Sequence, residues 1–349
     1  MTGLHFHPLK VRKVGRDTDD AVAVTFDVPA DLADAFRFAA GQYLNLRHGE
    51  LRRSYSICAA PGEPLRVGVR RVPGGEFSTW LHTSLKAGDT IDVMEPLGHF
   101  GGNAATRSRR LLAVAGGSGI TPILSIVRSR LGGDPQARCT LLYGNRTLAS
   151  TMFKEEIEDL KNRFITRLSV HPVFSREAVD SPLHAGRIDA DKIATVLRLA
   201  GPVDEAFVCG PHAMNDEVEA TLRAMGLAPG QIHVERFGVP PGAAAAPVVP
   251  AEAGLAGARV VVVRDGITRE LVLGHAGESV LAAASRAGLD VPYSCRSGVC
   301  ATCRARLLEG QIRMDRNFAL EPADIDAGFV LTCQAHPLTA RVVVSYDDR

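Results

Sequence analysis

The chain lacks an excess of charge of either sign. Its 349 residues carry 40 Lys and Arg against 39 Asp and Glu, which leaves a formal net charge of +1. Binding of nucleic acid through phosphate neutralisation needs a clear basic excess, so the balance argues against that class of partner. Hydrophobic residues make up 46% and charged residues 23%, which is the composition of an ordinary folded protein.

The chain also lacks an apolar run long enough to cross a bilayer. Its longest uncharged stretch, Leu111–Val127, is too short and is interrupted by Gly-Gly-Ser-Gly and Thr-Pro. The N-terminal sequence MTGLHFHPLKVRKV has no apolar core of a signal peptide, so export is not expected. We therefore expect a cytoplasmic protein with no membrane contact. No internal repeat is present.

A chain of this length exceeds what one hydrophobic core usually organises. The segment 239–258, VPPGAAAAPVVPAEAGLAGA, is rich in Pro, Ala and Gly and nearly free of charge, which is typical of a linker. The pattern changes again near residue 105. These features predict a domain at 1–105, a second at 106–238, a linker at 239–258 and a third domain at 259–349.

The three domains show different secondary-structure patterns. Residues 1–105 contain short β-like runs separated by Gly and Pro, which favours an antiparallel β-barrel. In residues 106–238 apolar strands alternate with helical patterns, which favours an α/β domain with a parallel sheet. The C-terminal pattern of strands and one helix is typical of an α+β β-grasp fold.

Four of the seven cysteines lie close together near the C-terminus, at Cys295, Cys300, Cys303 and Cys333. The spacing Cys-x4-Cys-x2-Cys followed by a distant fourth Cys matches a plant-type [2Fe–2S] cluster, which requires four thiolates. A structural zinc site usually needs two Cys-x2-Cys pairs, and only one is present. Disulfides fit a cytoplasmic chain poorly. The quartet therefore predicts an iron–sulfur centre.

Two segments of the first domain suit a ligand that carries phosphate and a flat ring. On a strand, Arg53 and Tyr55 of Arg53-Ser54-Tyr55-Ser56 point to the same side. An arginine binds phosphate and an aromatic ring stacks on a heterocycle. Further along, Gly74-Gly75-Glu76-Phe77-Ser78 precedes a predicted helix whose N-terminus would attract an anion. Each segment alone also fits an ordinary strand or hairpin turn.

The second domain opens with an apolar strand and a glycine-rich turn, Gly116-Gly117-Ser118-Gly119-Ile120-Thr121-Pro122. The glycines allow close approach of a pyrophosphate, Thr121 is expected to cap the following helix, and Pro122 suits its first position. The turn differs from Gly-x-Gly-x-x-Gly and from the Walker loop. Further strands end at Tyr143-Gly144-Asn145-Arg146 and Cys209-Gly210-Pro211, and ligands of α/β domains collect at such ends.

Together these motifs resemble the ferredoxin–NADP reductase superfamily, with its Arg-x-Tyr-Ser, Gly-x-x-Ser and Gly-x-Gly-x-x-Pro sequences. The resemblance implies that FAD is bound in the barrel. Arg53 and Ser78 would hold its pyrophosphate and Tyr55 would pack on its ring, with Ser54 and Gly75 in the same motifs. Ser56 would reach the reactive edge of the ring. Glu235-Arg236-Phe237-Gly238 matches a Glu-x-Phe segment that returns towards the flavin, which assigns Glu235 and Phe237 to the site.

The same resemblance implies that Gly117, Gly119, Thr121 and Pro122 bind the nicotinamide nucleotide. Cys209 and Gly210 would border its nicotinamide. Ser56, Cys209 and Phe237 are thus the expected catalytic residues. Ser175 and Arg176 resemble the residues that recognise the 2′-phosphate of NADPH, and the basic Arg187 is near them in the sequence. This favours NADPH, with NADH as the alternative.

The order of flavin barrel, nicotinamide domain and ferredoxin domain resembles oxygenase reductases, most closely those that serve the di-iron phenylacetyl-CoA epoxidases. The resemblance implies electron transfer from NADPH through FAD and the [2Fe–2S] cluster to the oxygenase component of a multicomponent complex. One alternative is a reductase for another oxygenase, such as a Rieske-type hydroxylase of steroids or quaternary amines. A second alternative is an iron–sulfur sensor without turnover, which would have no use for a hydride donor.

Overall fold

The computed structural model of the chain describes residues 4–102, 108–239 and 255–348. The chain divides into two compact units. The larger unit holds His7–Leu51 and Tyr55–Phe237, and the smaller holds Gly238–Arg349 with the short stretches Met1–Phe6 and Arg52–Ser54. Most of the predicted linker lies outside the described residues. The linker and the domain limits given above therefore stay predictions.

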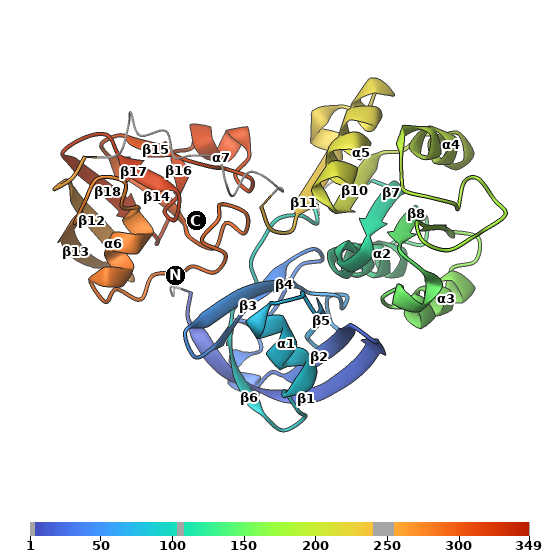
Figure 1. Cartoon of the computed structure of the whole chain (residues 1–349), viewed down its shortest axis with the longest axis horizontal. Helices are drawn as coiled ribbons and strands as arrows, with labels where there is room; N and C mark the ends of the chain where they lie inside the picture. Colours follow the sequence, from blue (N-terminus) through green and yellow to red (C-terminus); the bar gives the residue numbers. More distant parts are fainter. Residues whose placement is uncertain (1–3, 103–107, 240–254, 349) are drawn as a thin grey trace. The chain divides into compact units, whose positions relative to one another are not determined.

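The N-terminal part of the larger unit is an antiparallel sheet of six strands in the order β4-β3-β6-β1-β2-β5, curved into a barrel (Figure 1). Leu44, Val67 and Val93 are among the side chains that fill its interior. The longest strand, β1, is missing from the sequence prediction, because it is rich in Lys and Arg and is interrupted by a bulge near Lys13. The elements are β1 (Phe6–Thr18), β2 (Ala21–Asp27), η1 (Ala30–Leu32), β3 (Tyr43–His48), β4 (Leu51–Ser56), β5 (Arg66–Arg70), α1 (Glu76–Thr83) and β6 (Thr90–Met94).

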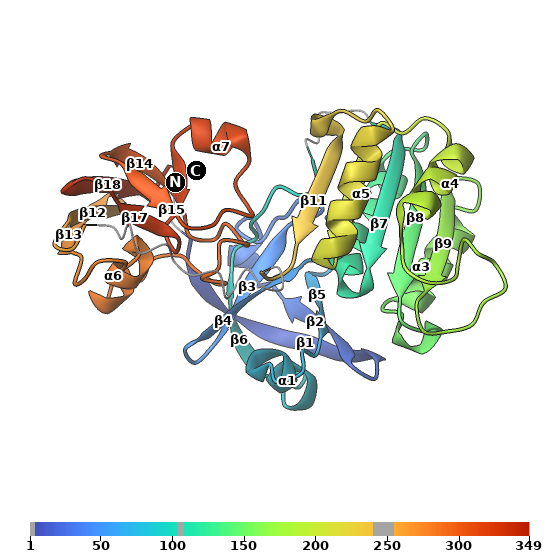
Figure 2. The same cartoon turned by 45° about the horizontal axis from the view of Figure 1, so that its top comes forward.

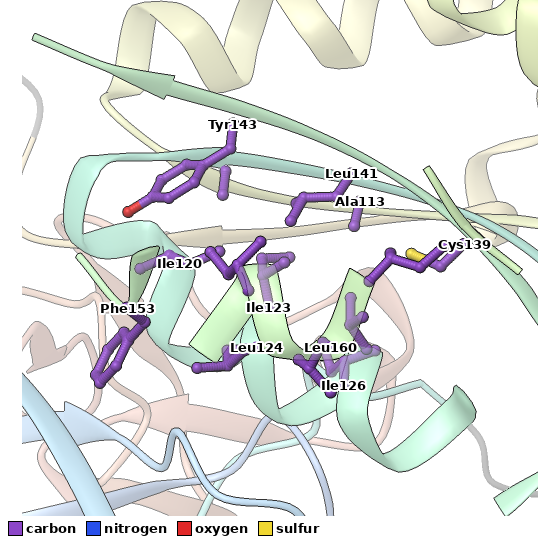
Figure 3. Close-up of a cluster of buried hydrophobic side chains, with 14 of the residues drawn as sticks. Ala113, Ile120, Ile123, Leu124, Ile126, Cys139, Leu141, Tyr143, Phe153 and Leu160 are labelled. Atoms are coloured by element: carbon purple, nitrogen blue, oxygen red, sulfur yellow. The ribbon is translucent and has the colours of Figure 1, made fainter. Parts of the chain in front are cut away.

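The rest of the larger unit is a parallel five-stranded sheet in the order β11-β10-β7-β8-β9, with helices on both faces (Figure 2). One face packs on α2 and α3 through the apolar cluster of Figure 3, and the other packs on α4 and α5. The elements are β7 (Arg110–Gly116), η2 (Gly117–Gly119), α2 (Ile120–Gly133), β8 (Arg138–Asn145), η3 (Leu148–Ser150), α3 (Lys154–Arg163), β9 (Leu168–Phe174), α4 (Ala190–Ala200), β10 (Glu205–Gly210), α5 (His212–Ala224), η4 (Pro229–Gln231) and β11 (Ile232–Arg236).

The smaller unit is a mixed five-stranded sheet in the order β13-β12-β18-β14-β16, accompanied by a β15–β17 ladder. Its central pair, β12 and β18, is parallel, and α6 packs against the sheet through Val280 and Leu281, as in a β-grasp fold. The three predicted fold types are thus confirmed. The elements are β12 (Arg259–Arg264), β13 (Ile267–Val272), α6 (Val280–Arg286), β14 (Arg304–Glu309), β15 (Ile312–Met314), α7 (Pro322–Asp326), β16 (Phe329–Leu331), β17 (Ala335–Pro337) and β18 (Arg341–Ser345). No helix in the described ranges has the length and apolar character that a membrane span requires.

Within the larger unit, strand β5 of the barrel forms much of the contact with the parallel-sheet lobe. The bare backbone of Gly68 is in close contact with the lobe, since a Cβ there would lie 2.7 Å from Thr121 Cγ2 and 2.8 Å from the Phe153 ring. Both carboxylate oxygens of Asp17 accept the Phe153 amide, at 3.0 and 3.1 Å. Arg66 donates two hydrogen bonds of 2.7 Å to Glu156. Half-buried, charge-assisted contacts therefore join barrel and lobe.

The glycine-rich turn of the lobe is pressed against the end of β10. A Cβ at Gly119 would lie only 2.0 Å from the carbonyl oxygen of Cys209. The Tyr143 hydroxyl fixes the other side of the turn by donating to the Gly117 carbonyl at 3.1 Å. The prediction that Thr121 caps α2 is wrong, because the short η2 turn carries the chain into the helix at Ile120. Thr121 instead donates to the Ser118 carbonyl at 3.0 Å inside the first turn.

The contact at Gly119 makes a prediction for stability. Gly119→Ala should lower the free energy of unfolding by about 3 kcal/mol, because the new methyl group meets backbone that cannot move aside. The matched control is Gly133→Ala at the end of the following helix, α2, where an added Cβ meets nothing within 4 Å. It should be neutral or stabilising by about 0.5–1 kcal/mol. Urea unfolding measures both, and equal stability of the two variants would contradict the close approach.

Candidate functional site

The barrel presents an anion-binding turn at the start of α1. The Ser78 hydroxyl accepts the amide of Val72 at 3.0 Å and donates to the Gly75 carbonyl at 3.3 Å, so it braces the turn from inside. The first turn of a helix leaves amide donors without partners in the helix. The turn therefore fits a phosphate group through its backbone, and Ser78 shapes it as well as being able to contact a ligand.

Successive side chains of strand β4 point to opposite sides, as predicted for the flavin motif Arg53-Ser54-Tyr55-Ser56. Arg53 is exposed, Tyr55 is half-buried and Ser56 is buried. The Tyr55 ring packs near Phe77, with ring centroids 6.0 Å apart. Phe77 belongs to α1, so the motif on β4 and the phosphate turn are brought together. An exposed guanidinium, an aromatic ring and a helix N-terminus on one side of the barrel fit FAD.

The carboxyl edge of the parallel sheet brings Cys209 and Glu235 side by side, since they are register partners on β10 and β11. The Asn215 side chain supports this edge by donating to the Glu235 carbonyl at 3.0 Å. Oε2 of Glu235 is shielded from solvent and has no hydrogen-bond partner among the described residues. Burial raises the pKa of Glu235 to about 8, and burial together with Glu235 raises the pKa of Cys209. Both groups are therefore mostly protonated at neutral pH.

Two predicted residues near this edge lie at its rim. Gly210 follows Cys209 at the end of β10, next to the Gly116 backbone, because a Cβ there would lie 3.0 Å from Gly116 Cα. Phe237 comes directly after β11 and is 39% exposed, which is unusual for a large apolar side chain. The edge thus holds a carboxylic acid and an exposed aromatic ring beside the glycine-rich turn, whereas the Cys209 thiol is fully buried in the apolar cluster that includes α2. That combination fits a nicotinamide nucleotide.

The predicted 2′-phosphate segment follows β9 at the same edge. Ser175 donates its amide to the Asn145 carbonyl at 3.0 Å, and Arg176 donates its amide to the Arg146 carbonyl at 2.8 Å. The chain then returns so that the Gly186 amide meets the Phe174 carbonyl at 2.8 Å, which brings Arg187 to the base of the same loop. Arg176 and Arg187 are exposed, and neither forms an ion pair within the described residues.

In the smaller unit the four cysteines form two pairs. A hydrogen bond from Cys300 lowers the pKa of Cys295 to about 4, and Cys303 and Cys333 form a second hydrogen-bonded pair. The charge of Cys300 also raises the pKa of Cys303, and the charge of Cys295 raises the pKa of Cys333. The two pairs are therefore neighbours. Across the described residues, no three His, Cys, Asp or Glu side chains converge on one point. Two adjacent pairs fit two irons better than one zinc ion.

The loop around the thiols turns hydrogen-bond donors towards sulfur. The Ser297 amide lies 3.4 Å from Cys295 Sγ, and the Thr302 hydroxyl donates to Cys300 Sγ at 3.2 Å. Arg296 and Ala301 adopt left-handed φ values of 54° and 52° in this loop. Such backbone is costly for residues with a Cβ and persists where the surroundings require it. Donors to sulfur are a means by which proteins tune such clusters.

Sequence reasoning missed several residues that shape these sites. Gln334 donates from Nε2 to the Arg296 carbonyl at 3.1 Å and to Cys333 Sγ at 3.6 Å, so it ties the fourth cysteine to the loop. The only indication of this role in the sequence was that Gln334 directly follows Cys333. Likewise, the only indication for Thr302 was its position between Cys300 and Cys303. Tyr143 was noted only as part of a strand end, and its contact with Gly117 depends on how β8 packs against the turn.

A cavity of about 540 Å³ between barrel and lobe lies apart from these residues. Four of the charged side chains that line it form ion pairs. Arg66 and Arg128 both bind Glu156, and Arg128 also binds Glu63 at 2.7 Å. None of the predicted site residues lines this cavity. It therefore belongs to the contact that joins barrel and lobe.

Comparison with protein families assigns each part of the chain. Residues 8–101 match an oxidoreductase FAD-binding domain, residues 113–220 an oxidoreductase NAD-binding domain, and residues 263–338 a 2Fe-2S iron-sulfur cluster binding domain. The expected cofactors FAD, NAD(P)H and [2Fe–2S] are thereby confirmed, with the choice between NADPH and NADH left open. The chain is an NAD(P)H-dependent flavin and iron–sulfur oxidoreductase.

The chain is similar over its whole length to components of oxygenase systems. It is 45% identical to a subunit of the 1,2-phenylacetyl-CoA epoxidase of Escherichia coli K12, over 98% of each chain. It is 34% identical to the ferredoxin reductase component of the 3-ketosteroid-9-alpha-monooxygenase of Rhodococcus rhodochrous, over 97% of this chain and 96% of the relative. Phthalate dioxygenase reductase has the same fold, with a TM-score of 0.61 over 97% of this chain and 98% of that one, at 24% identity. The chain belongs to the family of oxygenase reductases that carry an FAD-binding, an NAD-binding and a C-terminal plant-type [2Fe–2S] domain, within the ferredoxin–NADP reductase superfamily.

Proposed function

We propose that this reductase delivers electrons from NADPH to the di-iron component of an epoxidase that acts on phenylacetyl-CoA. The observation that carries the proposal is the 45% identity to one subunit of such an epoxidase over 98% of both chains. The bound FAD and [2Fe–2S] cluster would supply the conversion of a two-electron donor into single electrons. The chain's own residues hold these groups and position the nucleotide.

A second candidate partner is a steroid monooxygenase, because the reductase component of such an enzyme is 34% identical over nearly the whole chain. The domains would be the same, and only the receiving protein would differ. The lower identity makes this the weaker of the two proposals. An iron–sulfur sensor has no such support from relatives, and the NAD-binding domain argues against it.

For the flavin, we propose that Arg53 and the turn braced by Ser78 hold the pyrophosphate, with Ser54 and Gly75 in the same segments. Tyr55 would pack on the ring and Ser56 would face its reactive edge. For the nucleotide, the turn of Gly117, Gly119, Thr121 and Pro122 would bind the pyrophosphate. Cys209, Gly210, Glu235 and Phe237 would surround the nicotinamide, with protonated Glu235 keeping negative charge away from the thiol. Cys295, Cys300, Cys303 and Cys333 would bind the cluster.

We further propose that NADPH is preferred to NADH. The support is an exposed, basic loop, in which Arg176 follows Ser175, Arg187 lies at the base, and neither arginine has a carboxylate partner in the described ranges. A 2′-phosphate would supply the missing negative charge. We also propose that 239–258 links a ferredoxin domain to the two flavin-reductase domains, and that the protein acts in the cytoplasm, where cysteine thiols stay reduced.

Replacement of one cluster cysteine should separate two activities. Cys300→Ser removes one of four thiolates, so the visible absorption of the cluster should be lost while NADPH still reduces ferricyanide at the flavin. Cys139→Ser is the matched control, because Cys139 is a buried thiol of the lobe, outside the quartet. It should keep both the absorption and the activity. Loss of ferricyanide reduction in Cys300→Ser, with FAD still bound, would contradict separate sites.

The buried carboxyl of Glu235 predicts a pH dependence of stability. Its pKa rises from 4.5 to about 8 on folding, so between these values the unfolded chain is ionised and the folded chain holds a proton. Stability is therefore lost as the pH rises through this window. Glu235→Gln should remove the loss, and its advantage over wild type in urea midpoint should grow between about pH 5 and pH 8.

The control for this experiment is Glu158→Gln, an exposed carboxyl in α3 of the same lobe. Its urea midpoint should differ from wild type by an amount that does not change across the window. If the difference for Glu235→Gln is equally constant, Glu235 ionises at its ordinary pKa and the shielded acid is not part of the site.

The proposed partner is tested by reconstitution. The purified reductase is mixed with the oxygenase subunits of a phenylacetyl-CoA epoxidase or with the terminal component of a steroid monooxygenase, and NADPH-dependent product formation is measured. We expect product with the epoxidase at a rate at least tenfold above that with the steroid enzyme. Cys300→Ser serves as the control that consumes NADPH without product. The reverse preference would replace the first proposal by the second.

A further inference from the structure

Asn145 is a buried amide that the fold does not use. It ends strand β8 and is only 7% exposed. Neither Nδ2 nor Oδ1 has a hydrogen-bond partner among the described residues. Buried polar side chains are nearly always hydrogen-bonded, because leaving an amide unpaired away from water costs free energy. An amide with both atoms unpaired therefore needs an explanation.

The neighbours of Asn145 do not supply the missing bonds. The Tyr143 hydroxyl lies on the same face of β8, and a side-chain contact with the Asn145 amide opposes the burial that raises the pKa of Tyr143. This contact is not a hydrogen bond of standard geometry. The hydroxyl is directed instead at the carbonyl oxygens of Gly117 and Met152, at 3.1 and 3.2 Å. Ser175 bonds through its amide and its hydroxyl to the backbone carbonyl of Asn145, not to the side chain. The backbone at this position is thus fixed while the amide stays unpaired.

The position of Asn145 is at the centre of the nucleotide site. Strand β8 lies between β7, which leads into the glycine-rich turn, and β9, which leads into Ser175 and Arg176. Since Tyr143 reaches Gly117, Asn145 lies one step nearer the carboxyl edge, between the turn and the 175–176 segment. A dinucleotide that extends from one to the other has to pass this side chain. The part of the ligand between a pyrophosphate and a 2′-phosphate is the ribose of the adenosine.

The chemistry of the amide agrees with that position. An amide offers two donors and one acceptor group, so a hydroxyl, which both donates and accepts, can satisfy both of its atoms. A phosphate accepts only and would leave Oδ1 facing negative charge. The unpaired pair of atoms therefore suits a ribose hydroxyl better than a phosphate.

We propose that Asn145 is a nucleotide-binding residue that hydrogen-bonds the adenosine ribose of NAD(P)H through its side-chain amide. The contact involves a part common to NADPH and NADH, so it sets affinity for both and does not choose between them. The choice rests with Ser175, Arg176 and Arg187. This inference does not depend on which oxygenase receives the electrons.

The test compares Asn145→Ala with Asn215→Ala in the FAD-loaded protein without nucleotide. Asn215 is also buried, and its side chain donates a hydrogen bond to the Glu235 carbonyl, so its loss should lower the Tm. Asn145→Ala removes an amide that bonds to nothing, so its Tm should stay at or above that of wild type. A fall in Tm as large as that of Asn215→Ala would show that Asn145 is structural, and would overturn the proposal.

Ligand binding is then measured by titration with NADP⁺, NAD⁺ and ADP-ribose, which lacks the nicotinamide. Asn145→Ala should raise the Kd of all three by about tenfold, as expected for the loss of a hydrogen bond in a buried site. Arg176→Ala should raise the Kd of NADP⁺ alone. Unchanged affinity for ADP-ribose in Asn145→Ala would overturn the assignment to the adenosine ribose. Loss of FAD with unchanged nucleotide affinity would place the amide at the flavin instead, and would also overturn it.

Discussion

The close approach of the Gly119 backbone to the Cys209 carbonyl is the constraint on which the nucleotide site depends. It holds the glycine-rich turn against the end of β10, and the hydroxyl of Tyr143 holds the turn from the side of β8. Three strand ends, β7, β8 and β10, are thereby kept at fixed spacing. The turn can approach the backbone of Cys209 this closely only because Gly119 has no side chain. Preorganisation of this kind reduces the cost of binding.

A second contact determines how this site meets the barrel. Gly68 lets β5 touch Thr121 and Phe153, so the first turn of α2 rests directly on the barrel strand that precedes the phosphate turn. Asp17 accepts the amide of Phe153, whose φ of 55° places it in a left-handed conformation at the start of α3. Strain at that residue is tolerated because the carboxylate and the barrel surface both hold it. The barrel and the lobe, which hold Tyr55, Ser78 and the glycine-rich turn, are thus joined within the larger unit.

The sequence predicts most of what is local in this protein. The spacing of the cysteines, the glycine-rich turn and the alternation on β4 each depend on neighbours in the chain, and each is found where expected. The prediction fails where tertiary contacts decide. Strand β1 is rich in basic residues and needs its partners to form, and α2 starts before Thr121 because the η2 turn is pressed against β10. The pairing of the four thiols and the isolation of the Asn145 amide depend on packing, so no pattern in the sequence reports them.

Two of the polar groups that the fold leaves unsatisfied lie at the carboxyl edge of the parallel sheet, where the nucleotide is proposed to bind. Glu235 holds a shielded oxygen without a partner, and Asn145 holds two unpaired atoms. Each lowers the stability of the empty protein, so neither is explained by folding alone. A ligand that hydrogen-bonds to these atoms stabilises the folded state by mass action. Its binding free energy is more favourable because the folded protein has already lost the hydration of these atoms. The cavity between barrel and lobe shows a different pattern, because Glu63 and Glu156 in its lining are both bonded to arginine. Ion pairs thus join barrel and lobe, whereas the unpaired atoms of Glu235 and Asn145 lie where the nucleotide is expected.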